Sequence, residues 1–161
     1  MSPQSALPEA MSGGCQCGAV RFRVTELGRA SLCHCRMCQK AFGGIGGALV
    51  GARAFAYTRG APAYFQSSNK VRRGFCSACG TPLTFETAGS VDLAIAAFDQ
   101  PDLLPPVVQM SVETRLSWVD DIAGLPTRTA EEAASVAPHY AGIVSYQHPD
   151  HDTETWPPAR R

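Results

Sequence analysis

The chain carries three short cysteine clusters, Cys15-Gln16-Cys17, Cys33-His34-Cys35-Arg36-Met37-Cys38 and Cys76-Ser77-Ala78-Cys79, and no cysteine lies outside them. Such tight clusters are typical of metal sites, and a zinc ion closed by protein takes four thiolates in a tetrahedron. Seven cysteines are four plus three, so the count predicts one closed site and a second site with an open coordination position. Zinc does chemistry at an open position. An odd number of cysteines also argues against complete disulfide pairing.

A glycine follows two of the three clusters. Gly18 follows Cys17 and Gly80 follows Cys79, whereas the middle cluster has Gln39 at that place. Glycine readily adopts the positive φ that a turn between two ligands often needs. The first and third clusters are therefore interpreted as matching halves of one closed site, which leaves the middle cluster with three sulfurs.

Spacing by itself allows a second pairing. Cys35 and Cys38 could join Cys76 and Cys79 in a four-sulfur zinc ribbon. That arrangement would leave over the other three cysteines, Cys15, Cys17 and Cys33. The glycines favour the first pairing, and the spacing leaves both open.

Composition limits the class of protein. The 161 residues fit one domain with a hydrophobic core, and 15 glycines with 12 prolines favour turns and short strands over long helices. Lys plus Arg and Asp plus Glu both number 14, which argues against a protein that grips nucleic-acid phosphates. Residues 1–12 lack the basic and apolar regions of a signal peptide, and no apolar stretch approaches the roughly 20 residues that span a bilayer. We expect a cytoplasmic protein with reduced thiols and no nucleic-acid or membrane partner.

Local patterns predict mostly β-strands. We expect strands at residues 20–24, 30–32, 48–50, 55–57, 63–66, 71–75, 83–86, 91–97 and 110–119. One helical turn is expected at residues 38–42, and Thr129 with Glu132 forms a capping box that predicts a short helix. The predicted organisation is a flexible leader at 1–12, a zinc-binding domain at 13–128 and a C-terminal extension at 129–161, in which the short helix precedes a loose tail.

Three motifs carry a resemblance to a known family. They are Gly14-Cys15-Gln16-Cys17-Gly18, Cys33-His34-Cys35-Arg36-Met37-Cys38 and Arg73-Gly74-Phe75-Cys76-Ser77-Ala78-Cys79-Gly80-Thr81. Over about residues 13–118 the chain resembles the glutathione-dependent formaldehyde-activating enzyme family, also called the GFA or CENP-V domain. The resemblance implies an all-β Mss4-like fold, a tent of two facing antiparallel sheets stapled by zinc. It also implies two zinc ions per chain, a structural one on the first and third clusters and a catalytic one on the middle cluster.

The resemblance and the open site together predict an enzyme. The family's namesake reaction joins formaldehyde and glutathione, formally a carbon–sulfur lyase run in reverse, so we expect thiol and aldehyde substrates. Catalysis is assigned to Cys33, Cys35 and Cys38, where the open position can take water, a thiolate or a carbonyl oxygen. Arg36 and Lys40 are candidates for binding a substrate carboxylate. The alternative is a non-catalytic zinc module that binds another macromolecule.

Other charged residues near the clusters receive weaker assignments. Arg72 and Arg73 precede the third cluster and could offset the net charge of three thiolates on zinc. His34 could be a fourth ligand or a proton carrier. It lies between two predicted ligands, however, so its ring is expected to point away from the metal, either supporting the site from behind or lying at the surface. His148 and His151 fall in the expected tail, where they are interpreted as incidental.

Overall fold

Strands dominate the computed structural model, which describes residues 7–155. The strands and α-helices, in chain order, are β1 (Met11–Gly14), β2 (Arg21–Cys33), α1 (Arg36–Phe42), β3 (Gly47–Arg59), β4 (Ala63–Gln66), β5 (Arg72–Phe75), β6 (Pro82–Thr87), β7 (Ser90–Ala94), β8 (Gln109–Met110) and α2 (Ala130–Ala141). Single 3₁₀ turns lie at Ile95–Ala97, Pro101–Leu103 and Val112–Thr114, and a longer 3₁₀ segment lies at Val119–Gly124. The predicted all-β class is confirmed.

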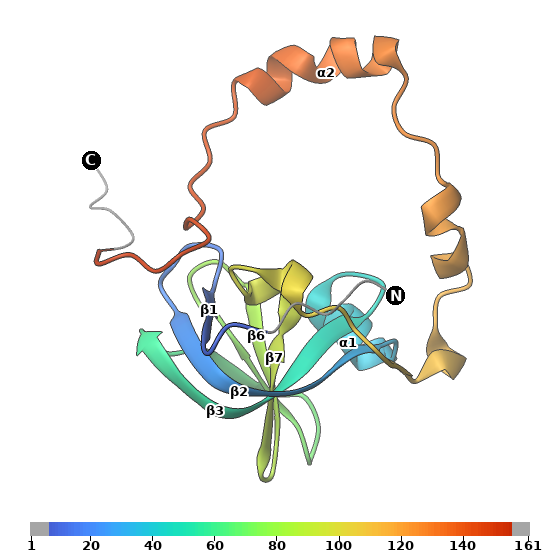
Figure 1. Cartoon of the computed structure of the whole chain (residues 1–161). Helices are drawn as coiled ribbons and strands as arrows, with labels where there is room; N and C mark the ends of the chain where they lie inside the picture. Colours follow the sequence, from blue (N-terminus) through green and yellow to red (C-terminus); the bar gives the residue numbers. More distant parts are fainter. Residues whose placement is uncertain (1–6, 156–161) are drawn as a thin grey trace. The chain divides into compact units, whose positions relative to one another are not determined.

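One sheet of eight strands runs in the order β1-β2-β3-β7-β6-β5-β4, and β8 pairs in parallel with β2. All other pairings are antiparallel within the described residues. Pairing of β3 with β7 joins one half of the sheet, β1-β2-β3, to the other half, β7-β6-β5-β4 (Figure 1). Phe22 of β2 and Val50 of β3 share one buried cluster with Leu83 of β6 and Leu93 of β7. The two facing sheets that the resemblance implies are thus halves of one sheet that bends around a common core.

The first part of β2 shows why this segment is a strand. Phe22 and Val24 are fully buried, while Arg23 between them is exposed, which is the period-two pattern of a sheet with one wet face. The expected strands at 20–24 and 30–32 merge into this one element. Register shifts against β3 between Val24 and Ala30 let the long strand bend, as β-bulges do.

The expected strands at 48–50 and 55–57 are parts of one strand, β3, and two other expected strands end earlier in the structure. The expected strand at 110–119 is wrong beyond Met110, because Ser111 has a left-handed φ of 55° that ends the pairing and starts a 3₁₀ turn. The strand expected at 91–97 ends at Ala94, because residues 95–97 form a 3₁₀ turn. Both helix predictions are confirmed: α1 ends at Gly43 with φ 62°, and Thr129 caps α2 in a complete capping box.

The described residues divide into two units. One contains residues 7–115 together with 147–155, and the other, called the arm below, is Leu116–Tyr146 (orange in Figure 1). None of the residues of α2 in the arm is buried. Residues 1–6 of the expected leader lie outside the described residues, and Met11 and Ser12 belong to β1. No helix in the described part of the chain has both the length and the apolar character needed to cross a bilayer.

Candidate metal centres

Two turns bring four cysteines together. Cys15 and Cys17 lie on the turn from β1 to β2, and Cys76 and Cys79 lie on the turn from β5 to β6. Their sulfur atoms all lie within 4.8 Å of one another, and we call this group the four-cysteine cluster. It is the pairing that the glycines favoured, and the ribbon pairing of the second and third clusters is not formed.

The glycines act as expected. Gly18 has φ 74° and Gly80 has φ 79°, both in the left-handed region. In these conformations the Gly18 N–H donates to Cys15 O at 2.9 Å, and the Gly80 N–H donates to Cys76 O at 2.8 Å. Each turn therefore closes around its pair of sulfurs. Both turns have a left-handed glycine whose N–H donates to the carbonyl of the first cysteine of the pair.

The four-cysteine cluster suits a zinc ion. Tetrahedral sulfurs at about 2.3 Å from zinc lie about 3.8 Å apart. The Sγ atoms of Cys15 and Cys17 are 3.6 Å apart, and those of Cys17 and Cys76 are 3.8 Å apart. The Val20 N–H donates to Cys15 Sγ at 3.2 Å, as expected for a thiolate ligand. Burial raises the pKa of Cys17 to about 12, so the four thiolates form together only when a cation compensates their charge.

The remaining three cysteines form a second group around the start of α1. Cys33 ends β2, Cys35 is the N-cap of α1 and Cys38 lies in its first turn. Their sulfurs also lie within 4.8 Å of one another, and we call this group the three-cysteine cluster. The Cys38 N–H donates to Cys35 Sγ at 3.4 Å. Burial would raise the pKa of Cys35, but this backbone donor and the neighbouring thiols outweigh it and lower the pKa.

A network of buried amides fixes the three-cysteine cluster on the sheet. The His34 N–H donates to Met110 O at 2.9 Å, which ties the cluster to β8. The side-chain amide of Gln39 donates to His34 O at 2.7 Å and to Thr114 O at 3.0 Å, and Thr114 Oγ1 donates to His34 O at 3.1 Å. The backbone between Cys33 and Cys35 is thereby held rigidly. Sequence reasoning missed Gln39 and Thr114, because nothing in their local pattern marks them.

His34 is not among the grouped ligand atoms, as its position between two ligands predicted. Its ring is fully buried, with Nε2 2.9 Å from Gln109 Oε1 and Nδ1 3.3 Å from Ile45 O. The ring therefore connects the cluster to β8 and to the segment before β3. A surface role for His34 is excluded by this burial.

The charged residues near the cluster fall into exposed and buried ones. Arg36 and Lys40 are exposed on α1, and the Arg36 guanidinium donates to Gln39 Oε1 at 3.2 Å. Arg72 forms an ion pair with Glu86 at 2.7 Å. Arg73 is buried, and its Nη2 donates to Cys38 Sγ at 3.5 Å. Within residues 7–155, Arg73 is thus the buried cation in direct contact with the three-cysteine cluster.

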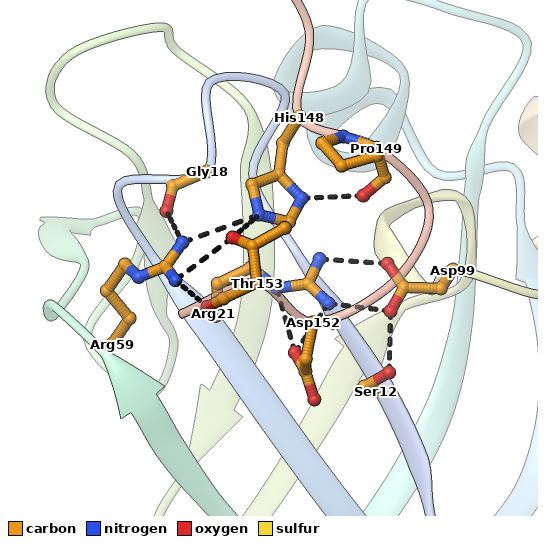
Figure 2. Close-up of polar contacts among 9 residues, drawn as sticks. All are labelled: Ser12, Gly18, Arg21, Arg59, Asp99, His148, Pro149, Asp152 and Thr153. Carbon is orange, nitrogen blue, oxygen red and sulfur yellow. Dashed lines mark hydrogen bonds and ion pairs between the residues drawn. The ribbon is translucent and has the colours of Figure 1, made fainter. Parts of the chain in front are cut away.

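A C-terminal segment lies against the four-cysteine cluster. We call residues 147–153 the strap. The His148 N–H donates to Gln16 O at 2.8 Å, in the turn between two cysteines. Arg59 of β3 donates to Gly18 O at 3.2 Å on the same turn and also bonds the backbone oxygen of Thr153 (Figure 2). Sequence reasoning gave no reason to expect these contacts in a segment interpreted as a loose tail.

A second arginine holds the strap through carboxylates. Arg21 of β2 is 3% exposed and bonds both oxygens of Asp99, at 2.8 and 2.6 Å (Figure 2). It also bonds Asp152 of the strap at 2.8 Å. Such a bidentate, buried pair is among the stronger charged contacts in proteins. A cavity of about 440 Å³ next to the strap borders the four-cysteine cluster and not the three-cysteine cluster.

The strap is expected to loosen as the pH falls. The Arg59 guanidinium can only donate, so His148 Nε2, 3.4 Å from Arg59 Nη1, accepts, and the proton sits on Nδ1 facing Pro149 O at 2.6 Å. Burial lowers the pKa of His148, and Arg21 and Arg59 lower it further, against the opposite pull of Asp99 and the Pro149 carbonyl. The docked strap therefore binds fewer protons than the free strap.

Docking of the strap contributes fully above the unperturbed histidine pKa of about 6.5 and weakens below it. Hydrogen exchange of the His148 amide should therefore accelerate, relative to the intrinsic rate, from pH 7 to pH 5. His148→Gln should remove this pH dependence, and His151→Gln, which changes an exposed neighbour, should keep it. Equal pH dependence in all three proteins would contradict the assignment.

Comparison with the sequence patterns of known families places the chain in one of them. None of the curated proteins matches the chain. The sequence pattern of the family described as glutathione-dependent formaldehyde-activating enzyme matches residues 10–114. This stretch is more than half of the 161 residues, contains all seven cysteines and spans the sheet that carries both clusters. The chain therefore belongs to the glutathione-dependent formaldehyde-activating enzyme family.

Proposed function

We propose that this protein is a zinc-dependent carbon–sulfur lyase or synthase that joins a thiol to an aldehyde, with glutathione and formaldehyde or another aldehyde as substrates. The observation that supports it most is the separation of seven cysteines into a group of four and a group of three. Four thiolates close a tetrahedron, whereas three leave one position for a substrate. Family membership supports the same reaction class.

The two clusters have different proposed roles. The four-cysteine cluster holds a structural zinc that fastens two turns of the sheet. Cys33, Cys35 and Cys38 hold a second zinc, which supplies a Lewis-acidic open position for a thiolate or a carbonyl oxygen. Arg36 and Lys40, exposed on α1 beside this cluster, are proposed to bind carboxylates of the thiol substrate.

The reaction balances without a further reactant. The thiol sulfur forms a bond to the aldehyde carbon, the carbon–oxygen double bond becomes a single bond, and the oxygen takes the proton that the thiol loses. The product is a hemithioacetal, in which the former thiol sulfur carries a 1-hydroxyalkyl group, and the reverse direction is the lyase reaction. We place this reaction in the cytoplasm, where thiol substrates stay reduced.

NMR exchange measurements on the zinc-loaded full chain test the proposal. We expect the rate of adduct formation between glutathione and formaldehyde, or another pair from a panel of thiols and aldehydes, to exceed the uncatalysed rate. Met37→Ala is the control, because Met37 is exposed beside the cluster and is not a ligand. A protein that holds two zinc ions but accelerates no pair would favour the non-catalytic interaction module.

A further inference from the structure

Neighbouring arginines on β5 have opposite environments. Arg72 has half of its side chain exposed and pairs with Glu86. Arg73 is only 7% exposed, because its strand lies between β4 and β6 and its side chain points to the other face. A buried arginine is unusual and is normally found with a carboxylate partner.

Arg73 has no such partner among residues 7–155. The ion pairs found there involve Arg21, Arg53 and Arg72. The Arg73 guanidinium carbon lies 5.0 Å from the centre of the Phe85 ring, and Nη2 contacts Cys38 Sγ at 3.5 Å. Its buried Nε has no hydrogen-bond partner. Among the described residues, the hydrogen-bond partner of Arg73 that can carry a negative charge is therefore the sulfur of Cys38.

The formal charges of the cluster account for the contact between Arg73 and Cys38. Three thiolates and one divalent ion give the three-cysteine cluster a net charge of −1. A buried charge is costly unless a charge of opposite sign lies beside it. Arg73 brings the net charge of the group to zero, and it does so from inside the protein, where solvent does not screen the interaction.

We propose that Arg73 is the charge-balancing partner of the three-cysteine cluster and acts as a positioning residue through Cys38. The other cations nearby do not fit this role: Arg36 and Lys40 are exposed, and Arg72 is already paired. The inference rests on the proposed ion at the three-cysteine cluster. It goes beyond the proposed function, because it assigns a residue that is neither ligand nor substrate contact.

Arg73→Met removes the charge and keeps most of the side-chain volume. Changing a residue that supports a metal ligand typically weakens metal binding by about 10–100-fold. We expect this loss for one of two bound ions, while the ion of the four-cysteine cluster keeps its affinity. Arg73→Lys retains the positive charge and should recover most of the affinity. Arg72→Met, on the neighbouring residue, is the matched control and should change neither ion.

The experiment is a chelator titration of the zinc-loaded full chain that measures zinc released per chain. A second readout replaces the released zinc by Co²⁺ and records the sulfur-to-cobalt charge-transfer band, which reports the donation from the thiolates of the cluster, Cys38 among them, and not only folding. The expected result is a two-phase release in which Arg73→Met shifts only the weaker-binding phase, together with a shifted Co²⁺ band. Circular dichroism follows the fold of each variant.

The outcomes separate this inference from the proposed function. A wild-type chain that holds only one zinc overturns the ion at the three-cysteine cluster itself. Two zinc ions with unchanged release and an unchanged band in Arg73→Met overturn the role of Arg73 alone. If Arg73→Met loses both ions, Arg73→Lys decides. Recovery of both ions supports charge balance, and loss of both ions shows that the guanidinium serves the fold instead.

Discussion

Cys76→Ser is expected to unfold the sheet around both clusters. Cys76 is 1% exposed and belongs to the main hydrophobic core, so the proposed structural zinc and the core share this residue. The four-cysteine cluster joins the turn after β1 to the turn after β5, which are about 60 residues apart in the chain. Without it the core loses the link between its two halves.

The expected loss of stability in Cys76→Ser is large because zinc binding contributes a large free energy. Structural zinc sites in small domains contribute about 10–16 kcal/mol of apparent binding free energy, and a domain of this size has a net stability of only about 5–15 kcal/mol. Loss of one of four thiolates is therefore comparable with the whole stability. We expect no cooperative thermal transition and fewer than one bound zinc per chain.

Thermal melting by circular dichroism and zinc analysis check this expectation. Ser77→Ala is the matched control, since Ser77 lies exposed in the same turn and is not a ligand. A Cys76→Ser protein that melts at the temperature of the wild type and retains two zinc ions would show that the four-cysteine cluster does not hold the fold.

Cys35→Ser is expected to abolish the reaction and leave the fold intact. Cys35 is both a proposed ligand and the N-cap of α1, where its sulfur accepts from the Cys38 N–H. Serine is a preferred N-cap residue, so the substitution keeps the helix start and removes the thiolate. One of the two zinc ions should be lost, and the rate should fall about 100-fold or more, because a direct ligand matters more than the residues that support it.

The measurement pairs zinc analysis with the NMR exchange assay on the same samples. Cys35→Ser should hold one zinc, melt cooperatively and react at the uncatalysed rate, while Met37→Ala should behave as the wild type. Two zinc ions in Cys35→Ser would contradict the assignment of Cys35 as a ligand. One zinc with full activity would place the reaction away from the three-cysteine cluster.

Features encoded by neighbouring residues could be predicted from the sequence. Gly18 directly follows Cys17 and Gly80 directly follows Cys79, and these two glycines predicted the grouping of the first and third clusters that the structure shows. The alternation around Phe22 and the capping box at Thr129 are equally local. The strand beyond Met110 was wrong, because the apolar pattern continues while Ser111 turns the backbone into the left-handed region.

Features that depend on long-range contacts could not be predicted. Arg73 and Cys38 are 35 positions apart, and only the packing of α1 against the sheet shows that they touch. Arg72 and Arg73 look alike in the sequence, yet the alternation of strand faces exposes one and buries the other. The strap is similar, since Asp152 finds Arg21 across 131 positions.

The strap also has a consequence for the covalent chain. The arm leaves the sheet unit after Arg115, and the chain rejoins that unit at Gln147. The N-terminal end of the arm continues directly from the sheet unit. The strap that follows its C-terminal end is bound to the same unit by Arg21 and Arg59 (Figure 2). A single protease cut within the exposed arm would give two fragments that migrate together in native gels and separate only in denaturant. The C-terminal fragment would then be an exchangeable peptide subunit of the protein.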